Sequence, residues 1–301
     1  MTTSSTHLHG LWLPLITPFR DGGLDEASLR QLVRHYAAKP IDGLVLGATS
    51  GEGLSLSWDE RARLVEVVRA ECDGIGRSLP ICLGLGGVAT SDLIEALDRT
   101  ASWPIDFYLI SSPPYVRPSQ RGLLAHFTAL ADRTAHPIVL YNIPYRSAVG
   151  LDNETLLQLA AHRAIAGLKD CCANRMQTRD LIARRPPDFR ILTGEDAQSF
   201  DALQAGADGA ILLSAHLETA TFAAILRHVK AGETEAAATS WAEVEDLTRL
   251  LFTEPSPAPA KYWLARTGLI ASPEVRLPMV EVGAALAARL DQEIERRRGG
   301  G

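Results

Sequence analysis

Eight short apolar segments alternate with eight longer amphipathic segments over the first 231 residues of the chain. The short segments are near-continuous apolar runs such as LVLGA, FYLIS, PIVLYN and AILLS. Runs of this kind are typical of strands that are covered on both faces, as parallel strands are. We therefore predict strands over residues 11–17, 43–48, 80–85, 106–111, 137–142, 165–169, 189–193 and 209–214.

The amphipathic segments between these strands predict helices. Asp25 and Asp152 stand at two of the expected helix starts, where acidic and capping side chains are favoured. Eight strands alternating with eight helices give a right-handed βα series, and closure into a (β/α)8 TIM barrel of the α/β class is the simplest arrangement. An open doubly wound sheet is the alternative, but no G-x-G-x-x-G follows the first strand. The expected helices cover residues 25–38, 58–73, 90–102, 119–134, 152–162, 175–184, 196–206 and 216–231.

After residue 231 the strand pattern stops. Residues 233–251, 258–267 and 279–298 are predicted to form three helices, with the proline-rich EPSPAP between the first two. We therefore expect a barrel catalytic domain over 1–231 and a three-helix C-terminal extension over 232–301.

Charge and segment composition narrow the function classes. The formal net charge is −6, so there is no basic excess to neutralise phosphates, which argues against a nucleic-acid partner. The chain has no run of 18 apolar residues, and Met1–His9 lacks the apolar core of a signal peptide. Four cysteines in 301 residues do not make a disulfide framework. These features predict a cytoplasmic protein without membrane contact.

Lysine is scarce in this chain, with four lysines among thirty basic residues. Arginine cannot replace lysine in imine chemistry because its guanidinium stays protonated. Lys169 ends the sixth predicted strand, in AIAGLKD, so its amine would begin inside a low-dielectric barrel that disfavours the ammonium form. We predict that Lys169 is a reactive amine; a salt bridge to Asp170 or a lysine extended to solvent is the alternative.

Other strand ends carry groups that could serve the same site, since catalytic groups lie at the carboxyl ends of barrel strands. Tyr141 could shuttle a proton, or its ring could simply fill the barrel. Arg146 could hold a carboxylate, or could be a solvated loop residue. Thr49 and Ser50 stand in a glycine-containing turn suited to a small carboxylate, although an ordinary polar turn would look the same. Tyr115 follows the fourth predicted strand, and by itself it is only weak evidence for a catalytic role.

The histidines show neither H-x-x-H nor H-E-x-x-H spacing, and GLGG at 84–87 lacks the rest of a phosphate loop. We therefore expect no metal site.

Several strings together resemble the dihydrodipicolinate synthase / N-acetylneuraminate lyase family of pyruvate-dependent aldolases, over nearly the whole chain. They are LITPF at 15–19, TSGE at 49–52, RPSQRGL at 117–123, YNIPYR at 141–146, GLKD at 167–170, TGED at 193–196, DGAILLSA at 208–215, EPSPAPAK at 254–261 and RLPM at 276–279. The resemblance implies a (β/α)8 barrel with C-terminal helices, usually in a homotetramer built as a dimer of dimers.

The resemblance also implies roles for individual residues. Catalytic roles fall on Lys169 as the Schiff-base lysine, Tyr141 as the proton relay, Thr49 as the link between tyrosines, and Tyr115 as the second tyrosine, which is contributed across a dimer interface. Substrate-binding roles fall on Ser50 at the pyruvate carboxylate, Arg146 at the carboxylate of the second substrate, and Ile211 beside pyruvate.

The reaction implied is a condensation of pyruvate with aspartate semialdehyde in lysine biosynthesis. It would need no metal and no organic cofactor. The alternative is another pyruvate-dependent aldolase or dehydratase acting on a sugar-acid or other aldehyde, and three departures from the synthase pattern favour it: Ala48, Ser147-Ala148 and Ser112-Pro113-Pro114-Tyr115. Outside this chemistry, a non-catalytic sensor or a pyridoxal phosphate enzyme would be the competing hypotheses, although no phosphate loop for that cofactor is visible.

Overall fold

The computed structural model describes residues 8–299. Expectations that concern residues 1–7 and 300–301 lie outside this range. The chain divides into two compact units. The first, here called the strand unit, contains the chain up to Trp12, Asp42–Val45 and Pro80–Leu212. The second, the helical unit, contains Leu13–Ile41, Leu46–Leu79 and the described chain from Leu213 onward. The predicted division at residue 231 stays a prediction.

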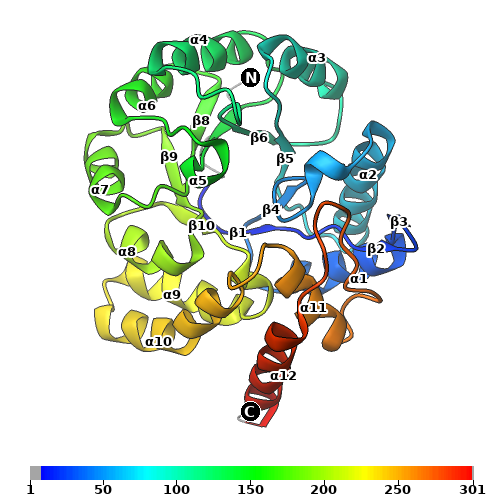
Figure 1. The fold of residues 1–301 in the computed structure, drawn as a ribbon. Coiled ribbons are helices and arrows are strands. Elements are labelled where there is room, and N and C mark those ends of the chain that lie inside the picture. The colour runs from blue at the N-terminus through cyan, green and yellow to red at the C-terminus, as the bar shows by residue number, and fades with distance from the viewer. Residues whose placement is uncertain (1–7, 300–301) are drawn as a thin grey trace. The chain divides into compact units, whose positions relative to one another are not determined.

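The strand unit holds a closed parallel barrel, in the order β1-β10-β9-β8-β7-β6-β5-β4 (Figure 1). The ring closes because Gly10, Leu11 and Trp12 of β1 pair in parallel with Gly209, Ala210 and Ile211 of β10. The expected eight-stranded barrel is therefore confirmed. Its strands are β1 (Gly10–Pro14), β4 (Gly43–Leu46), β5 (Ile81–Leu85), β6 (Phe107–Ser111), β7 (Ile138–Asn142), β8 (Ile165–Asp170), β9 (Arg190–Thr193) and β10 (Gly209–Ile211).

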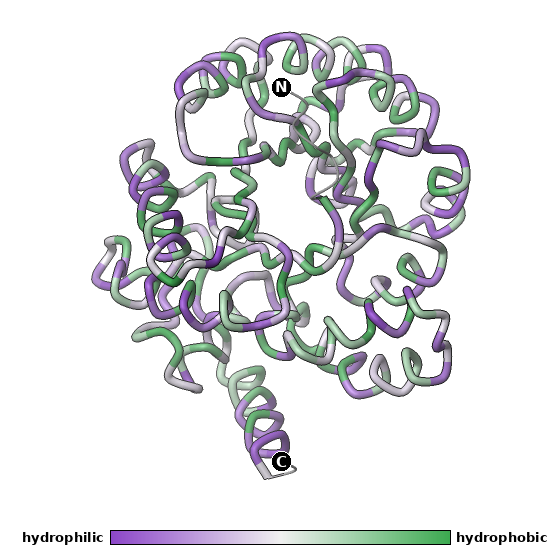
Figure 2. The backbone as a smooth tube through the Cα atoms, turned by 180° about the vertical axis from the view of Figure 1, so that it is seen from behind, coloured by the Kyte–Doolittle hydropathy of each residue, from purple (hydrophilic) through white to green (hydrophobic). Residues whose placement is uncertain are grey.

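Buried residues dominate these strands, as their apolar runs predict. Five of the strands, β4, β5, β7, β8 and β10, are buried at every position. In Figure 2 the strand segments are mostly hydrophobic, whereas the helices alternate between hydrophobic and hydrophilic residues. Burial on both faces is what an inner ring of parallel strands requires.

Helices lie outside the ring of strands in the strand unit (Figure 1). Asp152 caps one of them as predicted, because its side chain accepts a hydrogen bond from the Thr155 N–H at 2.7 Å. These helices are α3 (Thr90–Thr100), α4 (Gln120–Ala131), α6 (Asn153–Ala160), α7 (Arg175–Arg184) and α8 (Ser199–Gln204), with the short α5 (Pro144–Ser147) and η3 (Asp196–Gln198) in the loops after β7 and β9.

The helical unit contains the C-terminal helices that the sequence predicts. Three of them bury one apolar cluster, which comprises Leu247, Leu251, Trp263, Leu286, Leu290 and Ile294. The unit's helices are α1 (Glu26–Ala37), η2 (Gly53–Ser55), α2 (Trp58–Gly74), η4 (Ser214–His216), α9 (Thr219–Ala231), α10 (Thr234–Leu250), α11 (Ala258–Arg266) and α12 (Ala284–Gly299).

Two elements differ from the sequence-based expectation. Helix α12 begins at Ala284 rather than at residue 279, because the Gly283 N–H is held by the Glu254 carboxylate at 3.0 Å. A two-stranded hairpin, β2 (Phe19–Arg20) and β3 (Gly23–Leu24), was not predicted. Its turn is Asp21-Gly22, with both φ angles positive, which is the turn that tight hairpins favour.

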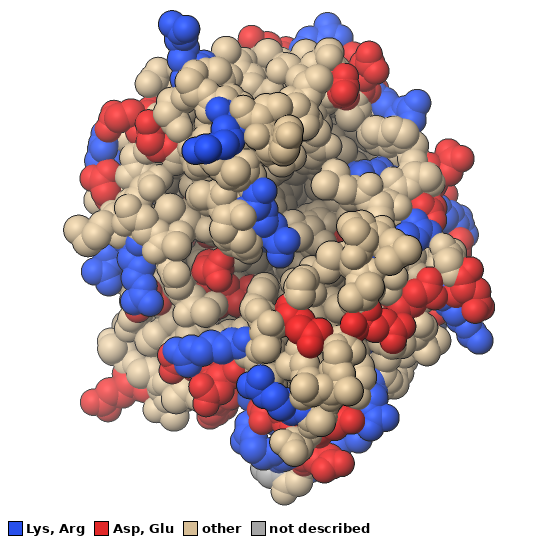
Figure 3. Space-filling model, viewed as in Figure 1, with Lys and Arg blue, Asp and Glu red and all other residues tan. Residues whose placement is uncertain are grey.

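Charged side chains of both signs are intermixed on the face drawn in Figure 3. Interhelical ion pairs account for part of this pattern, as between Arg184 and Glu154. None of the helices between residues 8 and 299 is long and apolar enough to cross a membrane. The four cysteines are free.

Candidate active site

Lys169 is buried at the carboxyl end of β8, with 5% of its surface exposed. Its Cα pairs with Tyr141 of β7 and Leu192 of β9. The β7–β8 register shifts between Ile138 and Val139, which leaves an extra residue in β8 ahead of Lys169. Bulges of this kind re-aim the side chains that follow them. The sequence-predicted amine therefore lies where barrel enzymes place reactive groups.

Tyr141 provides the nearest aromatic surface to this amine. The Lys169 Nζ atom lies 4.5 Å from the centroid of the Tyr141 ring, and the tyrosine is itself buried. A ring face at this distance attracts an ammonium group. The structure thus brings together the two residues that the sequence ranks first.

The Lys169 side chain does not pair with its sequence neighbour Asp170. Successive side chains of a strand point to opposite faces, and the Asp170 carboxylate instead accepts hydrogen bonds from Thr178 Oγ1 at 2.6 Å and the Cys172 N–H at 3.1 Å. Burial raises the pKa of Asp170, although these hydrogen bonds oppose the shift. The alternative reading of Lys169 as the partner of Asp170 is therefore wrong.

Gly194 makes room for the lysine side chain. A Cβ atom on Gly194 would lie 2.3 Å from Lys169 Cε and 2.7 Å from Cys171 Sγ, so no larger residue fits without moving one of them. Burial raises the pKa of the Cys171 thiol to about 12, although the positive charge of Lys169 opposes the shift. The thiol beside the amine is therefore neutral at ordinary pH and does not compete as an anion.

Arg146 and Lys169 both act electrostatically on Glu195. Burial and the neighbouring Asp196 raise the pKa of Glu195, and the two cations lower it. Arg146 is exposed on α5, with its guanidinium 5.3 Å from the centroid of the Tyr145 ring. An exposed cation that acts on the same carboxylate as Lys169 is suited to a carboxylate substrate.

The remaining predicted site residues belong to other strands and loops. Tyr115 is 91% exposed in the loop after β6 and has a left-handed φ of 73°. Ile211 is buried in β10 beside Trp12 of β1. Thr49 and Ser50 belong to the helical unit, where they lie in the loop after β4; Thr49 is half-buried and Ser50 is buried.

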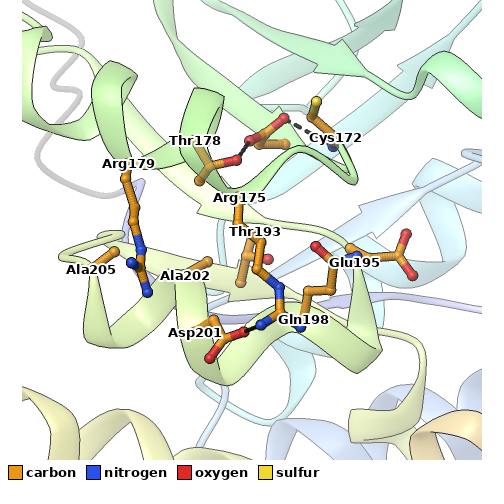
Figure 4. Close-up of a pocket in the computed structure, with 11 residues that line it drawn as sticks. Cys172, Arg175, Thr178, Arg179, Thr193, Glu195, Gln198, Asp201, Ala202 and Ala205 are labelled. Atoms are coloured by element: carbon orange, nitrogen blue, oxygen red, sulfur yellow. Dashed lines mark hydrogen bonds and ion pairs between the residues drawn. The ribbon is translucent and has the colours of Figure 1, made fainter.

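A separate pocket lies among α7, α8 and the loops that follow β8 and β9 (Figure 4). Arg175 and Asp201 form an ion pair at it, and Thr178 donates to Asp170 on its other side. Lys169 and Tyr141 are not among its lining residues. Glu195, on which Lys169 acts electrostatically, does line the pocket. Within residues 8–299, no group of three His, Cys, Asp or Glu side chains is arranged to hold a metal ion.

Sequence reasoning missed Gly194 and Glu195. Both belong to the TGED string, which contributed to the resemblance but was assigned no role. The available signal was its position, because residues 194–196 directly follow β9, which neighbours the strand that carries Lys169.

Known proteins match the chain over almost its full length. The profile of the Dihydrodipicolinate synthetase family matches residues 7–296. The 4-hydroxy-tetrahydrodipicolinate synthase 2 of Clostridium acetobutylicum is 40% identical over 285 residues, which are 95% of this chain and 99% of that protein.

Solved structures agree with this assignment. The 4-hydroxy-tetrahydrodipicolinate synthase of Methylacidiphilum fumariolicum is 31% identical, with a TM-score of 0.91 over 97% of this chain and 96% of that one. The chloride-inhibited dihydrodipicolinate synthase of Acinetobacter baumannii, solved as a complex with pyruvate, is 28% identical, with a TM-score of 0.91 over 95% of this chain and 98% of that one.

Proposed function

This chain belongs to the dihydrodipicolinate synthetase family, and we propose that it is a 4-hydroxy-tetrahydrodipicolinate synthase that condenses pyruvate with aspartate semialdehyde through an imine on Lys169. The observation that carries the proposal is the buried Lys169 amine, held over the Tyr141 ring at the carboxyl end of a barrel strand.

The chemistry begins at the amine. Lys169 Nζ attacks C2 of pyruvate, water leaves, and a protonated imine forms. This cation accepts the electron pair when C3 loses a proton, which gives an enamine nucleophile. Tyr141 moves the protons, together with Thr49 and Tyr115, and Ser50 and Ile211 contact pyruvate. The enamine carbon then attacks the aldehyde carbon.

Release follows from the second substrate. The amine of aspartate semialdehyde attacks C2, displaces Lys169 and closes the ring, so the lysine returns as a free amine. Arg146 is the residue we assign to the semialdehyde carboxylate, since an exposed guanidinium near the site can bind it through two hydrogen bonds.

The backbone of the loop that carries Arg146 supports the synthase assignment. Ala148 stands where synthases commonly have glycine, yet it adopts the left-handed conformation, with φ 61° and ψ 8°, and its N–H donates to the Pro144 carbonyl at 2.8 Å. This conformation costs a residue with a Cβ about 1–2 kcal/mol. The loop therefore keeps the turn that glycine would form, and this departure does not remove the arginine site.

We further propose that the enzyme works in the cytoplasm as a homotetramer, as the resemblance implies. The exposed ring of Tyr115 is available to a second copy of the chain. Four free cysteines suit a reducing compartment.

Trapping with borohydride tests the imine. In the presence of pyruvate, borohydride should add covalent mass to Lys169, and both Lys169→Ala and Lys169→Arg should abolish the adduct. Lys230→Arg, which changes an exposed lysine of α9, is the matched control and should be modified like the wild type. Trapping at another lysine would exclude the mechanism.

An acceptor screen with pyruvate held constant tests the second substrate. Aspartate semialdehyde, N-acetylmannosamine and sugar-derived aldehydes are compared by kcat/KM, and aspartate semialdehyde should rank first. A far higher value for a sugar-derived aldehyde would assign the chain to a different aldolase branch. Trapping without turnover on any aldehyde would instead indicate a sensor.

A further inference from the structure

The loop after β4 is closed on itself within the helical unit. Its backbone turns through hydrogen bonds from the Glu52 N–H to the Thr49 carbonyl and from the Gly53 N–H to the Ala48 carbonyl, both 3.1 Å. A Cβ atom on Gly53 would lie 1.6 Å from the Gly47 carbonyl oxygen, so the two ends of the loop are in direct backbone contact. This loop, residues 47–53, carries the hydroxyls of Thr49 and Ser50, which therefore depend on its shape.

Glu52 has an unfavourable backbone conformation in this loop. Its φ of 48° and ψ of 37° are left-handed, a region that residues with a Cβ rarely adopt. Strained residues of this kind persist only where the surrounding structure holds them. The Glu52 side chain is buried, with 4% of its surface exposed. Its contacts help to hold the turn, together with the Thr17 hydroxyl, which donates to the Gly51 carbonyl at 2.7 Å.

Lys261 of α11 holds the Glu52 carboxylate. The Nζ atom lies 2.5 Å from Glu52 Oε1, and no part of the lysine side chain is exposed. The same Nζ donates to the Glu274 carbonyl at 2.8 Å and lies 4.2 Å from the centroid of the Phe19 ring. The Arg276 N–H donates to Glu52 Oε2 at 2.9 Å. Each member of this buried ion pair therefore makes a hydrogen bond to a further group.

Removing one member of a buried ion pair strongly destabilises the charge that remains. A buried carboxylate whose cation is removed must leave the interior or take up a proton. Burial lowers the pKa of Lys261 to about 8, while Glu52 opposes that shift. Burying both charges carries a desolvation cost, which is explained if the loop must keep one shape.

We propose that Lys261 is a positioning residue that fixes the 47–53 loop through Glu52, and so holds the Thr49 and Ser50 hydroxyls in the arrangement that binds pyruvate. The effect on pyruvate rests on the proposed function. The hold on the loop rests only on the contacts within the helical unit.

Three variants separate positioning from general stability. Lys261→Met keeps the length of the side chain and removes the charge, which leaves Glu52 buried without its cation. Lys261→Met combined with Glu52→Gln replaces the ion pair by a neutral pair and should restore much of the loop. Leu290→Ala, in the apolar cluster of the C-terminal helices, is the control that loses stability without touching the loop.

Two measurements are made on each purified full-length variant. Hydrogen–deuterium exchange is read at the peptide that covers residues 47–56, and the KM for pyruvate is compared with kcat. We expect faster exchange at this peptide and a pyruvate KM raised at least about tenfold in Lys261→Met. The double variant should recover most of both effects, and Leu290→Ala should show neither, although its melting temperature falls.

Each outcome decides the inference. The inference is overturned if exchange at the loop is unchanged in Lys261→Met, or if exchange is faster but the pyruvate KM is unchanged. It is also overturned if the pyruvate KM rises equally in Leu290→Ala. If Lys261→Met fails to fold, the double variant is compared with Glu52→Gln alone. Slower exchange at the loop in the double variant than in Glu52→Gln, closer to the wild-type rate, supports the pairing. Equal exchange in these two variants opposes it. If borohydride adds no pyruvate adduct to the wild-type protein, the proposed function is refuted. The exchange data then test only whether Lys261 holds the loop.

Discussion

At the scale of single residues, the space around the reactive amine is set by Gly194. Its missing side chain leaves the volume that the Lys169 side chain occupies, and a Cβ atom there would lie 2.3 Å from Lys169 Cε and 2.7 Å from Lys169 Cγ. Contacts this short force a neighbour to move. The lysine chain is flexible, so it would move more readily than the backbone, and the amine would leave its place over the Tyr141 ring.

Gly194→Ala should therefore impair chemistry more than folding. We expect kcat/KM for pyruvate to fall about 100-fold, since displacing a reacting group by about an ångström has this size of effect. The rate of borohydride trapping measures the loss directly. Gly74→Ala is the control, because a Cβ at Gly74 has no neighbour within 4 Å, and it should behave as the wild type. A Gly194→Ala protein that is trapped at the wild-type rate would contradict the steric argument.

The sequence predicts part of this site well. Lys169 and Tyr141 could be found because each ends an apolar run, and parallel strands deliver their carboxyl ends to one edge. The sequence indicates no role for Lys261. An amphipathic pattern can place a charged residue on the buried side of a helix, but it cannot show an ion-pair partner more than 200 positions earlier in the chain. Such partners depend on tertiary packing, and spacing within one helix does not report it.

At the scale of elements, boundaries follow caps and turns. Helix α7 spans Arg175–Arg184, as predicted, and its N-cap Asn174 accepts from the Met176 and Gln177 N–H groups. The unpredicted hairpin at 19–24 is too short for an alternating pattern, although Asp21-Gly22 was the available signal. Strand β10 ends at Ile211, three residues short of the prediction, and the 3-10 turn η4 begins at Ser214. A buried apolar run does not distinguish these conformations.

Removing one cap should lower stability by a measurable amount. Asp152→Ala deletes the carboxylate that accepts from the Thr155 N–H at 2.7 Å, so the start of α6 loses a part-buried hydrogen bond. We expect the free energy of unfolding to fall by about 1 kcal/mol, measured by urea denaturation. Asp152→Ser should retain most of the wild-type value because serine also caps. Equal losses in the two variants would show that the cap is not the cause.

At the scale of the whole molecule, closure of the sheet is the feature that periodicity alone could not settle. An open and a closed sheet of eight parallel strands have the same alternating pattern, and the missing G-x-G-x-x-G was the sequence argument against the open form. The structure decides the matter through one pairing, β1 with β10, between segments about two hundred residues apart. Because long-range pairing depends on twist and strand tilt, local patterns do not encode it visibly.

The stability of the fold as a function of pH should depend on a buried imidazole. Burial lowers the pKa of His216 to about 4, and its Nδ1 lies 2.9 Å from the Leu213 carbonyl, which fixes the neutral tautomer with the proton on Nδ1. In the unfolded chain a histidine has a pKa of about 6.5. Between these two values the unfolded state binds a proton that the folded state does not. The free energy of unfolding therefore falls as the pH drops from about 6.5 toward 4, and this contribution does not change above that window.

The size of this effect follows from the two pKa values. Each pH unit within the window is worth about 1.4 kcal/mol for one histidine, so acidification from pH 7 to pH 5 should cost about 2 kcal/mol through His216. His35 and His126, whose pKa values burial also lowers, add to the total slope. His216→Gln removes the contribution of His216 to the pH dependence of stability, because an amide can still donate to the Leu213 carbonyl but does not titrate. Urea unfolding of both proteins at pH 7 and pH 5 should show a pH-dependent loss that is smaller in the variant by about 2 kcal/mol. If both proteins lose the same stability over this range, His216 is not the group that links acid to unfolding.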